Sequence, residues 1–200
     1  TLKAIRRKNV DDGKLEQFLK MYNDWDLPSY VELILGLPEE TFDSFVAGVT
    51  QVMELDQHNY IGIYPLTAFP NTPFGDPEYI KKYELDIVDT YTAFMHYDIS
   101  EQNDFERETM IVGTRTMDRE EYKKAYYFRW MVMYGHYLGV VQFISRFLRV
   151  HSNVSYEAFY KKLLEHSYDN PDSFLGKELK ETIKAIEGII AVEQPWGRIL

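Results

Sequence analysis

The 200-residue sequence contains no cysteine. Its absence excludes disulfide bonds, cysteine nucleophiles and thiolate ligands for zinc or an iron–sulfur cluster from this stretch of chain. Disulfides are rare in the cytoplasm, so a cysteine-free chain is expected to be cytoplasmic.

Positive charge and long apolar runs are also scarce. There are 22 Lys and Arg against 32 Asp and Glu, a net charge of −10. Nucleic acid and anionic membranes require clustered bases, so neither is expected as a partner.

The most apolar stretch, residues 130–148, carries His136, Gln142 and Arg146 and is expected to be a buried helix rather than a membrane span. No apolar segment of a secretory signal follows the basic segment Thr1–Arg7.

The residues that are present predict an α/β protein. The hydrophobic share of 45% and the aromatic share of 16% suffice for a compact core. Apolar spacing predicts helices from Asp11 or Asp12 to Pro28 and from Glu39 to Leu55, and strands at Tyr30–Leu35 and Tyr60–Leu66. Alternation of helix and strand with short links is typical of a (βα) barrel or a doubly wound parallel sheet.

The second half is predicted to be mostly helical. Residues 71–77 read as a loop, with little periodicity before Asp104, and Phe105–Thr116 is a strand candidate. Helices are expected from a cap at Asp118, paired with Glu121, towards Val150, from Ser155 through His166, and from Asp172 to Ile190. The predicted domains are 1–80, 81–116 and 117–200, the second a connecting segment.

Two parallel strands cannot close a barrel, and their edges would be unpaired. The missing strands are therefore expected upstream of Thr1. Cut from them, the chain is expected to self-associate through residues 30–35 and 60–66 or to cover these edges with its own tail.

Alternation of side chains divides each strand into two faces. Glu32, Ile34 and Gly36 share one face of the first strand, and Gly62, Tyr64 and Leu66 one face of the second. These faces have small and polar members, whereas the opposite faces are large and apolar. The former are therefore predicted to face a ligand.

Residues 34–41, Ile-Leu-Gly-Leu-Pro-Glu-Glu-Thr, resemble the Gly-Leu-Pro-Gly-Glu-Thr turn of radical S-adenosylmethionine (SAM) enzymes. Leu2–Asn9 is similar to the segment after the fourth barrel strand of that family, Glu32–Thr41 to the fifth strand and its turn, and Tyr60–Pro73 to the sixth. A further motif resembles the segment that precedes an aromatic-rich helical tail in the cobalamin-binding members of the family: Thr114, Thr116, Met117 and Asp118. The resemblance is strongest over 1–80.

The resemblance implies a SAM-binding role for several positions. Arg7 would pair with the SAM carboxylate, Glu32 would hold the ribose diol, and Ile34, with the backbone at Tyr64–Leu66, would line the adenine beside the turn at Gly36. The residues alone also allow a structural interpretation of each position: Arg7 as a solvated base, Glu32 as a surface acid at a strand end, and Ile34 as an ordinary core residue.

Two glutamates in the turn and one histidine have structural interpretations. Glu39 stands where the family turn has a glycine, and a positive φ at this position would strain a glutamate. Two alternatives are that the turn accepts a helical φ at Glu39 or that this branch of the family binds its ligand differently. Glu40, which matches the family glutamate, is expected in the first helical turn, where an acid favours the dipole. His136 is expected to be a hydrogen-bonded core residue, and the histidine spacing predicts no metal site held by protein alone.

The resemblance implies the C-terminal part of a cobalamin-binding radical SAM enzyme, a fragment of a (βα) barrel with its last parallel strands followed by a helical region. The parent would use SAM, a [4Fe–4S] cluster and cobalamin, often for methyl transfer to a small-molecule substrate. The ligands of cluster and cobalamin would lie in the N-terminal half, so the fragment would be inactive. The alternatives are a non-enzymatic α/β ligand-binding or interaction module, or a radical SAM parent with another outcome such as methylthiolation.

Overall fold

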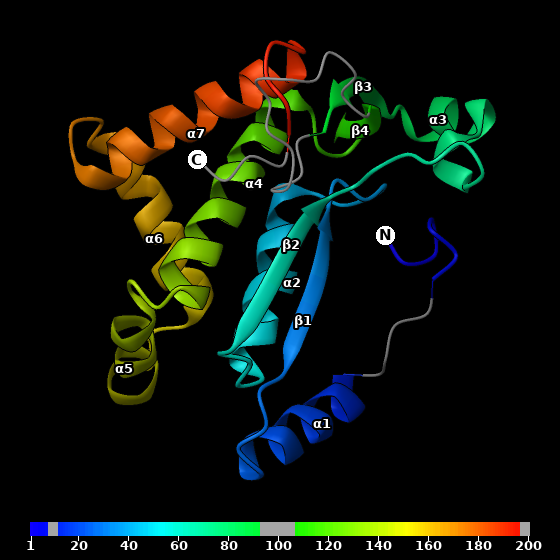
Figure 1. The fold of residues 1–200 in the computed structure, drawn as a ribbon. Helices are drawn as coiled ribbons and strands as arrows, with labels where there is room; N and C mark the ends of the chain where they lie inside the picture. Colours follow the sequence, from blue (N-terminus) through cyan, green and yellow to red (C-terminus); the bar gives the residue numbers. More distant parts are fainter. Residues whose placement is uncertain (8–11, 93–106, 197–200) are drawn as a thin grey trace, which may run out of the picture.

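A computed structural model describes residues 1–7, 12–92 and 107–196 (Figure 1). It is a mixed α/β structure, which confirms the α/β class predicted from the sequence. In chain order the elements are α1 (Asp12–Asp24), β1 (Tyr30–Leu35), α2 (Phe42–Glu54), β2 (Tyr60–Pro65), the 3₁₀ helix η1 (Pro73–Gly75), α3 (Pro77–Tyr83), β3 (Asp86–Tyr91), β4 (Arg107–Gly113), α4 (Arg119–Val132), the π-helix η2 (Met133–Tyr137), α5 (Gln142–Ser152), α6 (Tyr156–Asp169) and α7 (Phe174–Ile190).

The two predicted strands are confirmed and form a parallel pair. They are in register from Tyr30 opposite Tyr60 to Leu35 opposite Pro65. Beyond this pair, the amide of Leu66 donates to Leu35 O over 2.9 Å, and the amide of Ile111 in turn donates to Leu66 O over 2.9 Å. The end of β2 is thereby joined to β4, which itself pairs with β3 in an antiparallel hairpin.

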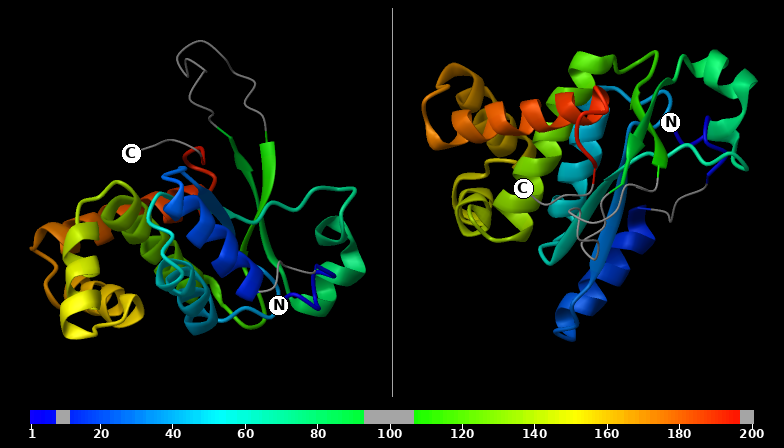
Figure 2. Two further views of the ribbon diagram at one scale, coloured as in Figure 1. Left: turned by 90° about the horizontal axis from the view of Figure 1, so that it is seen from below. Right: turned by 45° about the horizontal axis from the view of Figure 1, so that its top comes forward.

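One hydrophobic core connects the parallel strands to the helices that follow. Leu35, Ile61 and Ile63 are fully buried on the face of the pair that packs against α2. The same cluster includes Phe128 of α4 and Tyr160 of α6. In Figures 1 and 2, α4, α6 and α7 lie on one side of the parallel pair and α3 on the other. The alternation of large apolar residues along β1 and β2 therefore predicted the buried face correctly.

Residues 77–91 differ from the prediction of a segment with little regular structure. They form α3 and β3, separated by Glu84 with a left-handed φ of 49°. α3 has only seven residues, too few for helical periodicity to be visible in sequence, and β3 is stabilised by pairing with β4. The strand candidate at 105–116 is confirmed for Arg107–Gly113, whereas Phe105 lies outside the described residues.

The single long helix predicted from Asp118 towards Val150 is wrong. α4 passes into the π-helix at Met133, and the chain then turns through Gly139, at φ 83°, before α5 begins at Gln142. The Gln142 side chain donates to the carbonyls of His136 and His58, over 2.9 and 2.7 Å. The apolar pattern continued through this break because Phe143 and Phe147 of α5 maintain it, yet both are exposed.

Several helix starts differ by a few residues from the prediction. α2 begins at Phe42 rather than Glu39, after a reciprocal capping box of Thr41 and Ser44. Asp118 and Ser155 cap their helices as expected, but the last cap is Ser173 instead of Asp172, because the Ser173 hydroxyl accepts from Gly176 N. The proposed cap at Asp11 lies outside the described residues.

The outer edge of β1 is open, whereas that of β2 is partly covered. In the part of the chain that the structure describes, β1 pairs only with β2, while Arg129 of α4 donates from Nε to Ile63 O of β2. We therefore expect the isolated chain to self-associate through β1, because unpaired strand edges recruit other strands. Sedimentation velocity should show a concentration-dependent dimer, and Tyr30→Lys, which places a charge at this edge, should weaken it. A monomer at every concentration would contradict the expectation.

None of the helices in the described ranges has the length and apolarity that a membrane crossing requires.

Candidate functional site

The face of the parallel pair that turns away from α2 is open and polar. Glu32 and Tyr64 are exposed on it, next to Tyr30, which is 71% exposed. Gly62 lies beneath the ring of Tyr60, whose atoms would stand as close as 2.7 Å to a Cβ at that position. The two strands therefore present the predicted small and polar face to the outside, and their apolar face to α2.

A hollow of about 230 Å³ along the open edge of β1 brings together three predicted site residues, Arg7, Glu32 and Ile34. The segment that carries Arg7 is held in place because the hydroxyl of Tyr79 donates to Ala4 O over 3.0 Å. The hollow therefore has a guanidinium, a carboxylate and an aliphatic side chain on its wall.

A second and wider hollow of about 860 Å³ lies on the open face of the pair and also includes Glu32. Tyr64 lines it, as do Tyr60 and Tyr137. The hydroxyls of Tyr60 and Tyr64 lie 2.7 Å apart, and the ring of Tyr137 meets that of Tyr60 edge-on at 4.7 Å. The hydrogen bond to Tyr64, with burial second, raises the pKa of Tyr60 to about 12. Glu32 is thus the predicted residue that the two hollows share.

Gly36 and Leu66, the remaining predicted residues, are buried beneath the hollows and do not line them. Gly36 has φ 95°, a left-handed conformation in which an L side chain is strained. A Cβ there would stand 3.3 Å from the ring of Tyr122 and 3.4 Å from Ile111 O. Leu66 is 6% exposed, in a cluster against which Ile34 also packs. The glycine therefore allows the sharp turn after β1, and Leu66 supports Ile34 from below.

Glu39 adopts the positive φ that the family glycine suggested. Its φ is 63°, so the alternative of a helical φ at this position is wrong. A left-handed conformation costs a non-glycine residue about 1–2 kcal/mol. Two contacts hold it there: the Glu39 carboxylate pairs with Arg115, and its carbonyl accepts from the Thr1 hydroxyl over 3.2 Å. The exposed ion pair offsets only part of this strain.

Glu40 does not have the role predicted for it. It lies before the N-cap Thr41 and therefore outside the first turn of α2, whose acidic residue is Asp43. The Glu40 carboxylate lines the hollow of Arg7 and Glu32, and its Oε2 is buried without a hydrogen-bond partner in the described part of the chain. Burial raises its pKa to about 7, against the opposing effect of the Leu37 amide. The match to the family glutamate drew attention to Glu40 in the sequence, but the burial of its carboxylate could not be predicted from the sequence.

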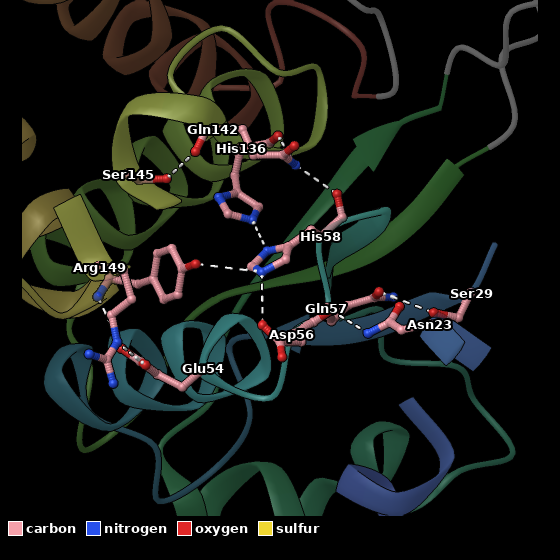
Figure 3. Close-up of polar contacts among 11 residues, drawn as sticks. Asn23, Ser29, Glu54, Asp56, Gln57, His58, His136, Gln142, Ser145 and Arg149 are labelled. Atoms are coloured by element: carbon pink, nitrogen blue, oxygen red, sulfur yellow. Dashed lines mark hydrogen bonds and ion pairs between the residues drawn. The ribbon is translucent and has the colours of Figure 1, made fainter. Parts of the chain in front are cut away.

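A pair of histidines, His136 buried and His58 half-buried, joins the loop before β2 to the π-helix (Figure 3). His58 Nδ1 lies 3.0 Å from His136 Nε2, and His136 Nδ1 lies 2.9 Å from the hydroxyl of Tyr160. His136 has no exposed surface, which confirms it as a hydrogen-bonded core histidine. Burial lowers the pKa of His136 to about 3, helped by His58 and Arg146. Sequence reasoning missed His58, since 78 residues separate the partners.

Comparison with known proteins gives two relatives. No protein-family model matches the chain. The chain is 32% identical over 177 residues to the cobalamin-dependent radical SAM methyltransferase TokK of Streptomyces tokunonensis. It is 30% identical over 175 residues to the 2-(S-pantetheinyl)-carbapenam-3-carboxylate methyltransferase of Streptantibioticus cattleyicolor. Each alignment covers 88% of this chain but 26% of the relative, so the chain spans about a quarter of the length of these proteins. The resemblance found in the sequence is confirmed.

Proposed function

Because the chain is homologous to cobalamin-dependent radical SAM methyltransferases, we propose that it is the C-terminal part of such an enzyme and that the parent transfers a methyl group. In this proposal β1 and β2 are the last parallel strands of a (βα) barrel, and the helices from α4 onward form a cap beside them. The observation that carries the proposal is the hollow at the edge of β1, where Arg7, Glu32 and Ile34 converge with the buried carboxylate of Glu40.

The side chains of this hollow suit the groups of SAM. The guanidinium of Arg7 would pair with the carboxylate of the methionine end, since its planar fork matches that anion. Glu32 would accept hydrogen bonds from the two ribose hydroxyls. Ile34 and the backbone at Tyr64–Leu66 would lie against the adenine. SAM supplies the methyl group, and on reductive cleavage it supplies the radical of this enzyme class.

The iron–sulfur cluster and cobalamin do not fit the residues of this chain. The sequence has no cysteine, and the described residues contain no group of three His, Cys, Asp or Glu that could hold a metal. We assign the ligands of both cofactors to the rest of the parent polypeptide. The 200-residue chain would by itself be inactive.

The exposed apolar surface supports a covering by more chain. Large apolar residues are exposed by more than half from the end of the π-helix to the end of α5: Leu138, Val140, Phe143, Ile144, Phe147 and Val150. Trp25 and Tyr30 at the foot of β1 are exposed as well. Contiguous apolar surface of this kind marks interaction sites in soluble proteins. We propose that the N-terminal half of the same polypeptide, in the cytoplasm, covers these surfaces and pairs with β1.

Replacing Glu32 by alanine in the full-length enzyme should weaken SAM binding ten- to a hundred-fold. The change removes charge-assisted hydrogen bonds to the ribose, worth about 1.5–3 kcal/mol. Equilibrium binding of SAM measures the effect, and iron content should stay unchanged because no cluster ligand is altered. Glu181→Ala, at an exposed acid of α7 outside both hollows, is the matched control.

Unaltered SAM affinity in the Glu32 variant would reject the ribose assignment. SAM cleavage by the 200-residue chain alone under reducing conditions would reject the assignment of the cluster to the missing part.

A further inference from the structure

A third cavity, of about 370 Å³, lies between α4, the π-helix, α7 and the segment that follows α7. This volume is in the range of small-molecule sites. Most of its wall is aromatic or aliphatic, from Tyr126, Trp130, Met133, Tyr134, Tyr137, Leu138, Ala185, Ile189, Pro195 and Trp196. No part of the SAM assignment uses these residues.

The aromatic walls of the cavity are held in fixed positions. Trp130 stacks on Tyr127 with ring centroids 5.5 Å apart, and the ring of Tyr134 lies 5.1 Å from that of Trp130 in a tilted arrangement. Trp196 is held by its backbone, whose amide donates to Tyr91 O over 2.8 Å. A flat apolar ligand would therefore meet preformed surfaces, at little cost in side-chain ordering.

Arg129 provides the cationic group of the cavity wall. Its Nε donates to Ile63 O, and its Cζ lies 5.1 Å from the centroid of the Tyr126 ring. These contacts position the guanidinium and leave its terminal nitrogens without an acidic partner among the described residues. A guanidinium that faces an apolar cavity binds a carboxylate strongly, because little water competes for it.

Trp196 adds a second donor that lacks a partner. Its indole Nε1 is buried and has no hydrogen-bond acceptor within the described ranges. A buried donor without an acceptor costs about 1–3 kcal/mol, so an acceptor supplied by a ligand would stabilise it.

The cavity lies next to the open face of β1 and β2, because the two share a lining residue. Tyr137 lines both this cavity and the hollow that contains Glu32. The charge of Glu32 raises the pKa of the Tyr60 hydroxyl and that of Arg129 lowers it, so both charges lie near this hydroxyl. A molecule anchored in the cavity would thus extend towards the face at which we place SAM.

From these features we propose that the cavity binds a monocarboxylate with a compact, ring-sized apolar body, with Arg129 and Trp196 holding the carboxylate. That this ligand is the methyl acceptor rests on the proposed function, whereas its binding in the cavity does not.

The test uses the 200-residue chain and two matched probes, 1-naphthoate and its neutral analogue 1-naphthalenemethanol, with affinities from isothermal titration calorimetry. Naphthoate should bind at least ten-fold more tightly than the alcohol. Arg129→Met should remove this preference and leave the alcohol's affinity unchanged, whereas Arg146→Met, at an exposed arginine outside the cavity, should change neither.

Two further variants keep the proposal testable if Arg129→Met does not fold. Trp196→Phe keeps the ring but removes the N–H, and should weaken naphthoate three- to ten-fold. Ala185→Phe fills the cavity and should abolish binding of both probes. Equal affinity of the natural chain for naphthoate and the alcohol would overturn the proposal, as would an unchanged affinity in Ala185→Phe. Neither outcome bears on SAM binding by Glu32, which is measured separately.

Discussion

Glu40→Gln should stabilise the chain at pH 8 and have much less effect at pH 5. The reason is that burial raises the pKa of Glu40 from 4.5 to about 7. In the unfolded chain this carboxyl is ionised above pH 4.5, whereas the folded chain keeps it protonated until about pH 7. The stability that it contributes is therefore present at low pH and lost as the pH rises through 7.

The expected size follows from the shift in pKa. Each pKa unit corresponds to about 1.4 kcal/mol, so the free energy of unfolding of the variant relative to the natural chain should increase by roughly 2–3 kcal/mol between pH 5 and pH 8. Urea unfolding of both proteins at the two pH values measures it. A carboxyl titration of Glu40 by NMR is an independent check, and a midpoint near 4.5 would contradict the burial of this group.

Acidification should act in the opposite direction through His136. Burial, helped by His58 and by the positive charge of Arg146, lowers the pKa of His136 from 6.5 to about 3. Below pH 6.5 the unfolded chain binds a proton at this residue and the folded chain does not, so its contribution to stability is lost as the pH falls. At pH 5 the loss is about 2 kcal/mol, from 1.5 pH units at about 1.4 kcal/mol each.

The Glu40 and His136 effects nearly cancel in the natural chain between pH 7 and pH 5, so single variants are needed to separate them. His136→Gln should lose about 2 kcal/mol less than the natural chain on this change of pH, although it should be less stable at pH 7 because it disturbs the contacts with His58 and Tyr160. The same pH dependence in the variant as in the natural chain would show that His136 is not the group concerned.

The pH effects also illustrate what local sequence could reveal. The turn after β1 was recognised from its residues, and with it the position of Glu40. The pKa of Glu40 depends on how completely the surrounding chain removes water from its carboxylate, and that follows from packing. His58 and His136 have no common spacing in sequence, since the contact arises only where the start of β2 meets the π-helix.

The sequence by itself determined the features that depend on neighbouring residues. Alternation along β1 and β2 specified their buried and open faces, because successive side chains of a strand point to opposite sides. The caps at Asp118 and Ser155 were identified since each bonds an amide three residues away. The resemblance to radical SAM enzymes rested on contiguous segments in the same way, and the homology confirms it.

Tertiary structure alone decided the features that depend on distant residues. α3 is too short to be periodic, and β3 is defined by its partner β4. The break after α4 is stabilised by Gln142, whose side-chain amide donates to the carbonyl of His58 in the loop before β2. The cavity at Arg129 needs α4, the π-helix and α7 together. Burial, pKa and cavity shape are set by what surrounds a residue in space, and contacts across dozens of residues leave no regular spacing in the sequence.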